Sequence, residues 1–231
     1  MKFIRVDDFP YGDPSFFRRK ENCIERFIAA ISLLESEDVD YVIGVTPFLI
    51  ESSHFDILNG ILKRGKAVMH GFTHAWDFEP WSNITSCWRK GGEFSRYSES
   101  ETAKRDYGNA LEVMSKLKRF DEKIHIPPFN CYNQHFIDAF EHHGGQLILG
   151  CDKEHINYDH GNHKHLSSRV SLSRWQISYG DASQVNSMIR EIDLKKEHIT
   201  LHWCFDTEQH SQWKSDYRNL VSNFKMLCKN D

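Results

Sequence analysis

Short apolar runs rich in β-branched residues alternate with segments of helical periodicity along most of this 231-residue chain. A regular alternation of strand and helix predicts parallel strands joined by right-handed crossovers. Such units close more naturally into a barrel than into an open sheet at this length. The sequence therefore predicts an α/β fold, an irregular TIM-like (β/α)7 barrel, with a doubly wound open sheet as the alternative. The expected strands are Lys2–Val6, Tyr41–Val45, Lys66–His70, Lys123–Pro127, Gln146–Gly150, Trp175–Ser178 and His198–Trp203.

The helical segments are indicated by apolar spacing and by residues typical of helix ends. Gly65 is expected to act as a C-cap for the helix that precedes it. Ser98, with Glu101 three residues later, has the pattern of a capping box at a helix start. The expected helices are Glu21–Ser36, Phe55–Arg64, Ser98–Arg119, Asn133–His143, Ser183–Ile192 and Gln209–Lys229.

The composition is that of a globular protein. Hydrophobic residues make up 39% of the chain and charged residues 27%, which supports one core and a single barrel domain over residues 1–231. The net charge is −4 and no basic stripe is present, so nucleic acid is not expected as a partner. The six cysteines form no CxxC pair and are expected to be free thiols in a reducing compartment.

Targeting and membrane signals are also absent from the sequence pattern. No apolar run approaches the roughly 20 residues that span a bilayer. The first residues, Met1 and Lys2, lead straight into a strand and not into the apolar core of a signal peptide. We therefore expect a cytoplasmic protein without a membrane span, while its oligomeric state is left open.

Polar residues are concentrated at the predicted C-terminal ends of the strands, where barrel enzymes carry their active sites. The first strand leads into Asp7 and Asp8. The third strand ends at His70, with His74 four residues later, and the last strand contains His202. Because these ends meet at one mouth of a barrel, we expect a polar ring there.

His70 and His74 lie on either side of the turn in "HGFTH". The preceding strand and Gly71 argue against the helical HExxH pattern of zinc peptidases. On a strand-to-loop turn, the two imidazoles can converge on one ion, with Asp8 as the third ligand and an open position for water. A chance pair is the alternative in a chain with 14 histidines, but a strand end beside two aspartates favours a metal site.

Asp7 and His202 are the predicted proton-transfer residues. With Asp8 on the cation, Asp7 lies beside it and can accept a proton from a water that the cation acidifies. His202 faces the same mouth and can donate a proton to a leaving group. The structural alternatives are an Asp-Asp turn that caps a loop and a core histidine bonded to a backbone carbonyl.

Aromatic residues crowd the loops that follow the strands, and exposed aromatic faces suit stacking on sugar rings. We expect Trp76, Trp203, Phe129 and Asn130 to contribute to substrate binding. A backbone N–H near Phe129 and Asn130 is expected to stabilise an oxyanion. Packing of the barrel loops is the alternative for the aromatic residues.

Four motifs, in this order, resemble those of the NodB-type polysaccharide deacetylases, carbohydrate esterase family four. They are the strand that ends in Asp-Asp, the His-x-x-x-His after the third strand, the Pro-rich end of the fourth strand and the Leu-His of the last strand. The similarity covers residues 4 to 203, and the form His-Gly-x-Thr-His resembles a divergent branch.

The resemblance implies a distorted (β/α)7 barrel of the NodB type and a divalent metal, usually zinc, with nickel, cobalt or manganese as alternatives. It implies a metal-dependent carbohydrate N-deacetylase, which hydrolyses an acetyl or formyl amide on an amino sugar. The expected cytoplasmic location favours an amino sugar of a surface glycan or its precursor as the substrate. On the matching positions, Asp7 is the general base and His202 the general acid. The metal ligands that it implies are Asp8, His70 and His74.

Two features depart from the family pattern. Ile126 stands where the fourth-strand motif has an arginine that pairs with the base aspartate, and Arg5 or Arg174 is the candidate substitute. The second departure is a long insert from Ala75 to Tyr97, which is expected to overhang the mouth. The alternatives to the deacetylase are a non-catalytic glycan-binding or scaffold protein on the same fold and an amidohydrolase of a non-sugar amide.

Overall fold

The structure, a computed structural model, describes residues 2–10, 23–74, 92–150, 163–172, 189, 192–202 and 213–230. Seven parallel strands form a closed barrel in the order β1 to β7, with β7 hydrogen-bonded to β1. This confirms the predicted (β/α)7 barrel. The strands are β1 (Ile4–Phe9), β2 (Tyr41–Val45), β3 (Lys66–His70), β4 (Phe120–Ile126), β5 (Leu147–Gly150), β6 (Lys164–Leu172) and β7 (Glu197–His202).

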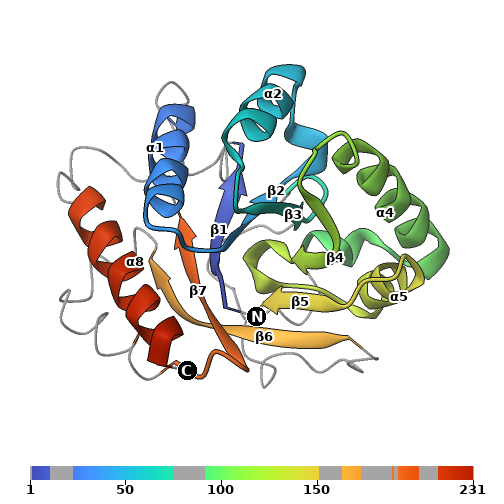
Figure 1. The fold of residues 1–231 in the computed structure, drawn as a ribbon. Helices are drawn as coiled ribbons and strands as arrows, with labels where there is room; N and C mark the ends of the chain where they lie inside the picture. The colour runs from blue at the N-terminus through green and yellow to red at the C-terminus, as the bar shows by residue number, and fades with distance from the viewer. Residues whose placement is uncertain are drawn as a thin grey trace, which may run out of the picture.

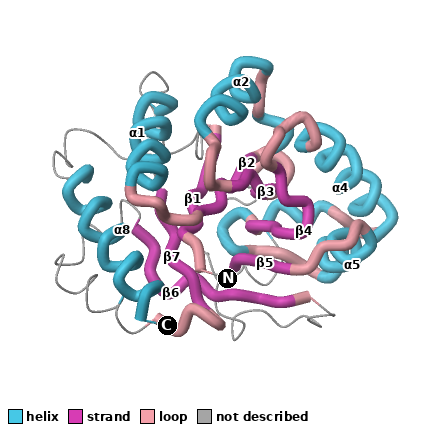
Figure 2. The backbone as a smooth tube through the Cα atoms, viewed as in Figure 1, coloured by secondary structure: helices cyan, strands magenta, loops and turns pink. Residues whose placement is uncertain are grey.

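The described helices lie outside the strands, with α1 and α8 on the left, α2 at the top and α4 and α5 on the right of Figures 1 and 2. Short 3-10 turns follow β2 and β4, so the strand ends on that side lead directly into the loops of one mouth. The helices are α1 (Cys23–Ser36), α2 (Ser52–Ile61), α4 (Ser100–Met114), α5 (Gln134–His142) and α8 (Trp213–Asn230), with 3-10 turns η1 (Pro47–Leu49), η3 (Gly92–Arg96) and η4 (Pro128–Asn130).

Each strand divides its side chains between two environments, because successive residues point to opposite faces. In β1, Ile4 and Val6 belong to the large apolar cluster under the helices. Arg5 and Asp7 have the opposite orientation and point into the barrel. The apolar part of the interior is a second cluster, made of Phe3, Val42, Val68, Ile124, Ile126, Leu147, Leu149 and Leu166.

The sixth strand is the main difference from the sequence expectation. β6 covers Lys164–Leu172 and pairs with β5 and β7, although the sequence predicts no strand there. Its serines, lysine and arginine hide the alternation of Leu166, Val170 and Leu172. The predicted strand Trp175–Ser178 lies outside the described residues.

Two predicted helices differ from the structure at both ends: α2 is Ser52–Ile61 and not Phe55–Arg64, and α4 is Ser100–Met114 and not Ser98–Arg119. Glu99 is the N-cap of α4 and no side-chain cap is made, so Ser98 and Glu101 form no capping box. Instead, Lys104 donates to the Glu101 carboxylate at 2.6 Å. α2 ends at Ile61 with Leu62 as its C-cap, so Gly65 caps no helix. Gly65 is needed for packing, because a Cβ there would lie 2.0 Å from the Tyr41 ring.

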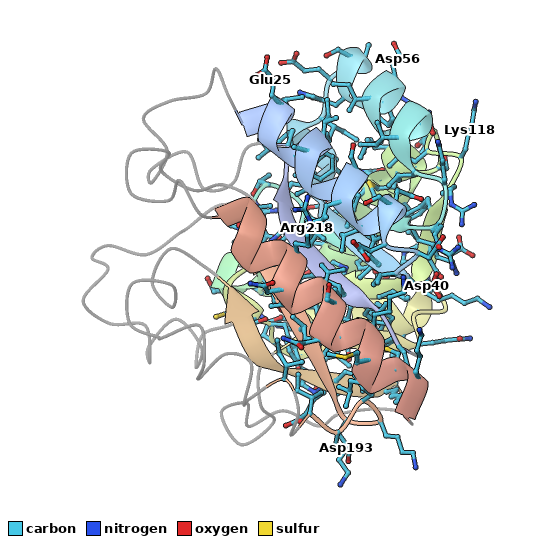
Figure 3. The ribbon with its side chains drawn as sticks, turned by 60° about the vertical axis from the view of Figure 1, so that its left-hand side comes forward. Glu25, Asp40, Asp56, Lys118, Asp193 and Arg218 are labelled. Atoms are coloured by element: carbon cyan, nitrogen blue, oxygen red, sulfur yellow. The ribbon has the colours of Figure 1, made fainter. Side chains whose placement is uncertain are left out.

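Charged side chains cover the outer surface. The six residues labelled in Figure 3 are all exposed: Glu25, Asp40, Asp56, Lys118, Asp193 and Arg218. Among the described residues, no helix combines the length and the apolar character that crossing a membrane requires.

Candidate metal centre

Asp8, His70 and His74 converge where β1 and β3 end. Nε2 of His70 lies 2.9 Å from Oδ1 of Asp8, and Nε2 of His74 lies 3.2 Å from the same oxygen. The two imidazole centroids are 4.7 Å apart. One ligand atom from each residue lies within 4.8 Å of the others, a grouping that could hold a metal ion. The structure thus brings together the three residues that the sequence predicts as ligands.

This donor set fits a divalent cation of the zinc type. A tetrahedral ion with ligands at about 2.0–2.2 Å separates its donor atoms by roughly 3.3–3.6 Å. The two imidazole nitrogens lie 2.9 and 3.2 Å from the Asp8 oxygen, close to that spacing. Two imidazoles and one carboxylate, with a fourth position for water, are a ligand set typical of catalytic zinc.

Hydrogen bonding directs His70 toward the site. Nδ1 of His70 lies 3.0 Å from the carbonyl oxygen of Ile126. Because a carbonyl only accepts, Nδ1 carries a hydrogen. Nε2 is then the ring nitrogen that faces Asp8 and can supply its lone pair to a cation held between them. Gly44 leaves room for the ring, since a Cβ there would lie 3.1 Å from Cβ and Cγ of His70.

The backbone at this mouth adopts an uncommon conformation. Asp8, His74 and Asn130 have φ values of 69°, 52° and 56°, in the left-handed region. For residues other than glycine this conformation costs about 1–3 kcal/mol, and such residues cluster at functional sites. Two of the three convergent side chains are therefore placed by strained backbone.

Asp7 is buried and held by Arg5. Nε and Nη2 of Arg5 donate to the two carboxylate oxygens of Asp7, each at 2.6 Å, and both side chains are only 2% exposed. Two residues apart on β1, they point to the same side of the strand. A bidentate pair of this kind fixes the carboxylate plane and compensates its buried charge. Of the two arginines that the sequence offers as partners, Arg5 makes this pair, and Arg174 lies outside the described residues.

Arg5 is itself anchored by three further elements. Its Nη1 donates to Oδ1 of Asn130 at 3.0 Å and to the carbonyl oxygen of Leu149 at 2.9 Å. Nε2 of His198 lies 3.4 Å from Nη1 and is the acceptor, because a guanidinium only donates. Burial lowers the pKa of His198 well below its usual value, and Arg5 and His165 add to the shift. Arg5 and Asp7, which we call the buried clamp, are thus connected through Arg5 to η4, β5 and β7.

The contacts of Asn130 bear on the predicted oxyanion site. Its backbone N–H donates to the carbonyl oxygen of Pro127 at 3.0 Å, and its side-chain oxygen accepts from Arg5. These contacts leave the backbone N–H of Phe129 as the candidate oxyanion donor at η4.

The other predicted site residues are described only in part. His202 is the last residue of β7, and its Cα pairs with that of Asp7 across the β1–β7 ladder. Its side chain and that of Phe129 lie outside the described part of the structure, as do Trp76 and Trp203.

Glu93 and His125, which the sequence reasoning does not single out, support the turn between the histidines. The carboxylate of Glu93 accepts from the backbone N–H groups of Phe72 and Thr73, and Nε2 of His125 lies 3.4 Å from the backbone N of Gly71. Burial raises the pKa of Glu93, against hydrogen bonding from Phe72 and the nearby His74. Burial also lowers the pKa of His125 well below its usual value. The only sequence feature that points to this support is His125, which stands between Ile124 and Ile126 in β4.

No family model matches the sequence, and no curated protein matches it. Several solved structures are similar to this chain. A proposed polysaccharide deacetylase from Mycobacterium smegmatis has a TM-score of 0.60 and 11% identity, over 100% of this chain and 86% of that one. A family 4 acetyl xylan esterase from Clostridium thermocellum, in complex with a cobalt ion, has a TM-score of 0.57 and 11% identity, over 99% and 83%.

A third similar structure is a carbohydrate esterase family 4 pseudoenzyme from Bacillus anthracis, with a TM-score of 0.53 and 10% identity, over 100% of this chain and 61% of that one. The chain therefore has the fold of the family 4 carbohydrate esterases, as the motifs predict. At this identity, the likeness establishes the fold and not the activity.

Proposed function

We propose that this protein is a divergent family 4 carbohydrate esterase that hydrolyses an acetyl or formyl amide on an amino sugar of a surface glycan or its precursor. The observation that carries the proposal is the placement of Asp8, His70 and His74 next to the Arg5-bound Asp7 at one barrel mouth. The similar structures with deacetylase or esterase names, one of them with a cobalt ion, support it.

Asp8, His70 and His74 would hold the metal, with zinc as our first choice and nickel, cobalt or manganese as alternatives. When bound, a divalent cation in this site would polarise the acyl carbonyl and acidify a water molecule. The chain's part is to direct the Nε2 atoms of both histidines at the Asp8 carboxylate, which the His70–Ile126 hydrogen bond helps to do.

Asp7 accepts the proton of the attacking water. Arg5 occupies both of its oxygens with one hydrogen bond each, and a carboxylate has about four lone-pair sites, so a site for the proton remains. The fork also compensates the charge of a carboxylate that is 2% exposed, which would otherwise be expensive to bury.

His202 donates a proton to the departing amine, and the backbone N–H of Phe129 stabilises the oxyanion. The pairing of His202 with Asp7 across the β1–β7 ladder supports this assignment, because it brings both residues to the same strand end. Water adds to the acyl carbon, the C–N bond breaks, and the products are an amino sugar and acetate or formate. Trp76, Trp203 and Phe129 are our proposed stacking residues for the sugar.

A non-catalytic glycan-binding protein is the second candidate, because a pseudoenzyme has the same fold. The presence of Asp7, Asp8, His70 and His74 in one site favours turnover. A third candidate, an amidohydrolase of a non-sugar amide, would use the same residues and differ only in substrate.

The test is the release of acetate or formate by the zinc-loaded protein from N-acylated amino-sugar oligomers, nucleotide-linked amino sugars and simple N-acyl amides, with His202→Ala as the comparison. Release from a sugar that falls strongly in the variant is the expected result. Release from simple amides alone would favour the amidohydrolase. Metal and oligosaccharide binding without any release would favour the binding protein. A cytoplasmic location stays a prediction, which cell fractionation would check.

A further inference from the structure

The turn between the two histidines is held by a carboxylate from outside the motif. We propose that Glu93 is a positioning residue for the metal-binding turn, residues 70–74, and that it keeps His74 directed at Asp8 before any metal arrives. The inference rests on the proposed function, since it assigns a role in building the same site.

Glu93 uses both carboxylate oxygens on this turn. The backbone N–H of Phe72 donates to Oε1 at 2.6 Å, and the N–H and hydroxyl of Thr73 donate to Oε2 at 3.3 and 3.4 Å. Glu93 is fully buried, at 0% exposure, and its bond to the Phe72 amide is buried as well, so water does not compete there. The bonds to Thr73 are partly buried. Hydrogen bonds to a charged acceptor are about twice as strong as neutral ones.

The shape of the turn explains why it needs such an acceptor. Gly71 and His74 both have left-handed backbone, with φ values of 64° and 52°, and the amides between them are not paired within a strand or helix. The carboxylate lies directly against the backbone, because a Cβ on Gly71 would come within 2.1 Å of Oε1 of Glu93. Leaving a buried amide without an acceptor costs free energy, and this cost favours a different turn that moves His74.

Packing fixes the position from which Glu93 reaches the turn. Glu93 lies in η3, and its neighbour Phe94 packs edge-on against Phe72 with ring centroids 5.4 Å apart. Nδ2 of Asn133, the N-cap of α5, donates to the carbonyl oxygen of Phe94 at 2.9 Å. η3 is therefore anchored to the turn on one side and to α5 on the other, so Glu93 can act as a rigid support.

Glu35 offers a matched control. Its carboxylate accepts from the Tyr41 hydroxyl at 2.6 Å and from the backbone N–H groups of Lys63 and Arg64 at 2.9 Å each. It thus also accepts backbone N–H groups of a loop, with Oε1 alone, at the loop that enters β3 from the opposite end of the barrel. At Glu93 a glutamine has one acceptor oxygen instead of two and turns an NH2 group toward an N–H donor. At Glu35 the amide oxygen can take the place of Oε1 and keep all three bonds.

The experiment compares wild type, Glu93→Gln, Glu93→Asp and Glu35→Gln in two measurements: the affinity for Zn²⁺, by competition with a chelating dye, and amide hydrogen exchange at Phe72 and Thr73 in the metal-free protein. We expect both Glu93 variants to bind Zn²⁺ about 10–100-fold more weakly and to exchange faster at the two amides. Glu35→Gln should match wild type in both. The aspartate variant keeps the charge, in case the glutamine variant does not fold.

Wild-type Zn²⁺ affinity and unchanged exchange in the Glu93 variants would overturn the inference while leaving the proposed function intact. An equal loss of Zn²⁺ affinity in Glu35→Gln would also overturn it, since the effect would then be one of general stability. If wild type binds no metal, the proposed function fails, and the exchange rates alone decide whether Glu93 holds the turn.

Discussion

At the N-terminal end of the barrel, the interior is filled by apolar side chains such as Phe3, Val42 and Ile124. At the C-terminal end, inward-facing positions carry Asp7 and His70, both buried. The buried Arg5 side chain reaches Asp7 from the level of Val42. Burying apolar side chains stabilises the fold, whereas burying charges costs free energy unless they are paired. The two ends therefore contribute differently to stability. The apolar end stabilises the barrel, and the polar site at the other end lowers that stability because its charges are buried.

The backbone makes the same distinction. Asp8, His74 and Asn130 are three of the four non-glycine residues with positive φ in the part of the chain that the structure describes, and all three lie at the polar mouth. Substitutions at the apolar end should thus change stability and leave the site chemistry intact. Substitutions of the site residues at the polar end should change the chemistry, and those that break a buried charge pair should change stability as well.

The largest expected effect is on catalysis, from Asp7→Asn at the polar end. Removing the proton acceptor should lower kcat/KM for acyl release by about 10²–10⁴-fold, while Zn²⁺ affinity stays close to that of wild type, because Asp7 is not among the three ligands. Kinetics on the best substrate and metal analysis of the purified variant check this. Full activity in Asp7→Asn would remove Asp7 from the mechanism.

Arg5→Met should cost about 3–5 kcal/mol of unfolding free energy, because it leaves the Asp7 charge buried without its partner. Urea denaturation of wild type and variant measures the loss. The matched control is Arg64→Met, whose exposed pair with Asp38 spans 3.3 Å and should be worth less than about 1 kcal/mol. Equal losses in the two variants would contradict the role given to the buried clamp.

At the apolar end, Ile124→Ala should destabilise the barrel by about 2–5 kcal/mol, through lost burial and the cavity that remains. Its Zn²⁺ affinity should equal that of wild type under conditions where both are folded. A large drop in affinity for the folded variant would show that the two ends are not independent.

The pH dependence of stability is the smallest of the expected effects. The pKa values of His125 and His198 are depressed by burial, so below the unfolded value of about 6.5 the unfolded chain binds protons that the folded chain does not. Stability should be full above that pH and fall as the pH drops, by at most about 1.4 kcal/mol per pH unit for each histidine.

Denaturation at pH 7.5, 6.5 and 5.5 measures this slope, with His142→Ala, at an exposed position, as a control that should leave it unchanged. Glu93 acts in the opposite direction, because a raised pKa favours the folded state at low pH and that contribution is lost as the pH rises. Repeating the denaturation series in Glu93→Gln removes the contribution of Glu93 to the pH dependence of stability. Stability that is flat or rises toward pH 5.5 would contradict buried neutral histidines.

The sequence predicts the barrel well because its signals are local. Apolar runs and helical spacing indicate most elements, and strand ends indicate where polar residues gather. β6 is missed because its polar side chains conceal the period-two pattern. Gly65 and Ser98 have residue types typical of caps, but tertiary packing sets the helix ends elsewhere.

The support of the site is harder to predict because it comes from residues distant in sequence. Asp8, His70 and His74 have a recognisable order, whereas the choice between Arg5 and Arg174 as the partner of Asp7 needs the structure. Even so, Arg5 and Asp7 are two residues apart on one strand, and this spacing favours a shared face. Glu93 carries no such pattern, since its contacts with the turn depend on how η3 packs.

The central claim, that Asp8, His70 and His74 hold one divalent cation, is tested most directly by calorimetric titration of the metal-stripped protein with Zn²⁺. We predict one ion per chain for wild type and loss of that binding in Asp8→Ala and His70→Ala, with both variants still folded. Absence of binding in wild type, or an unchanged stoichiometry and affinity in the two variants, would contradict it.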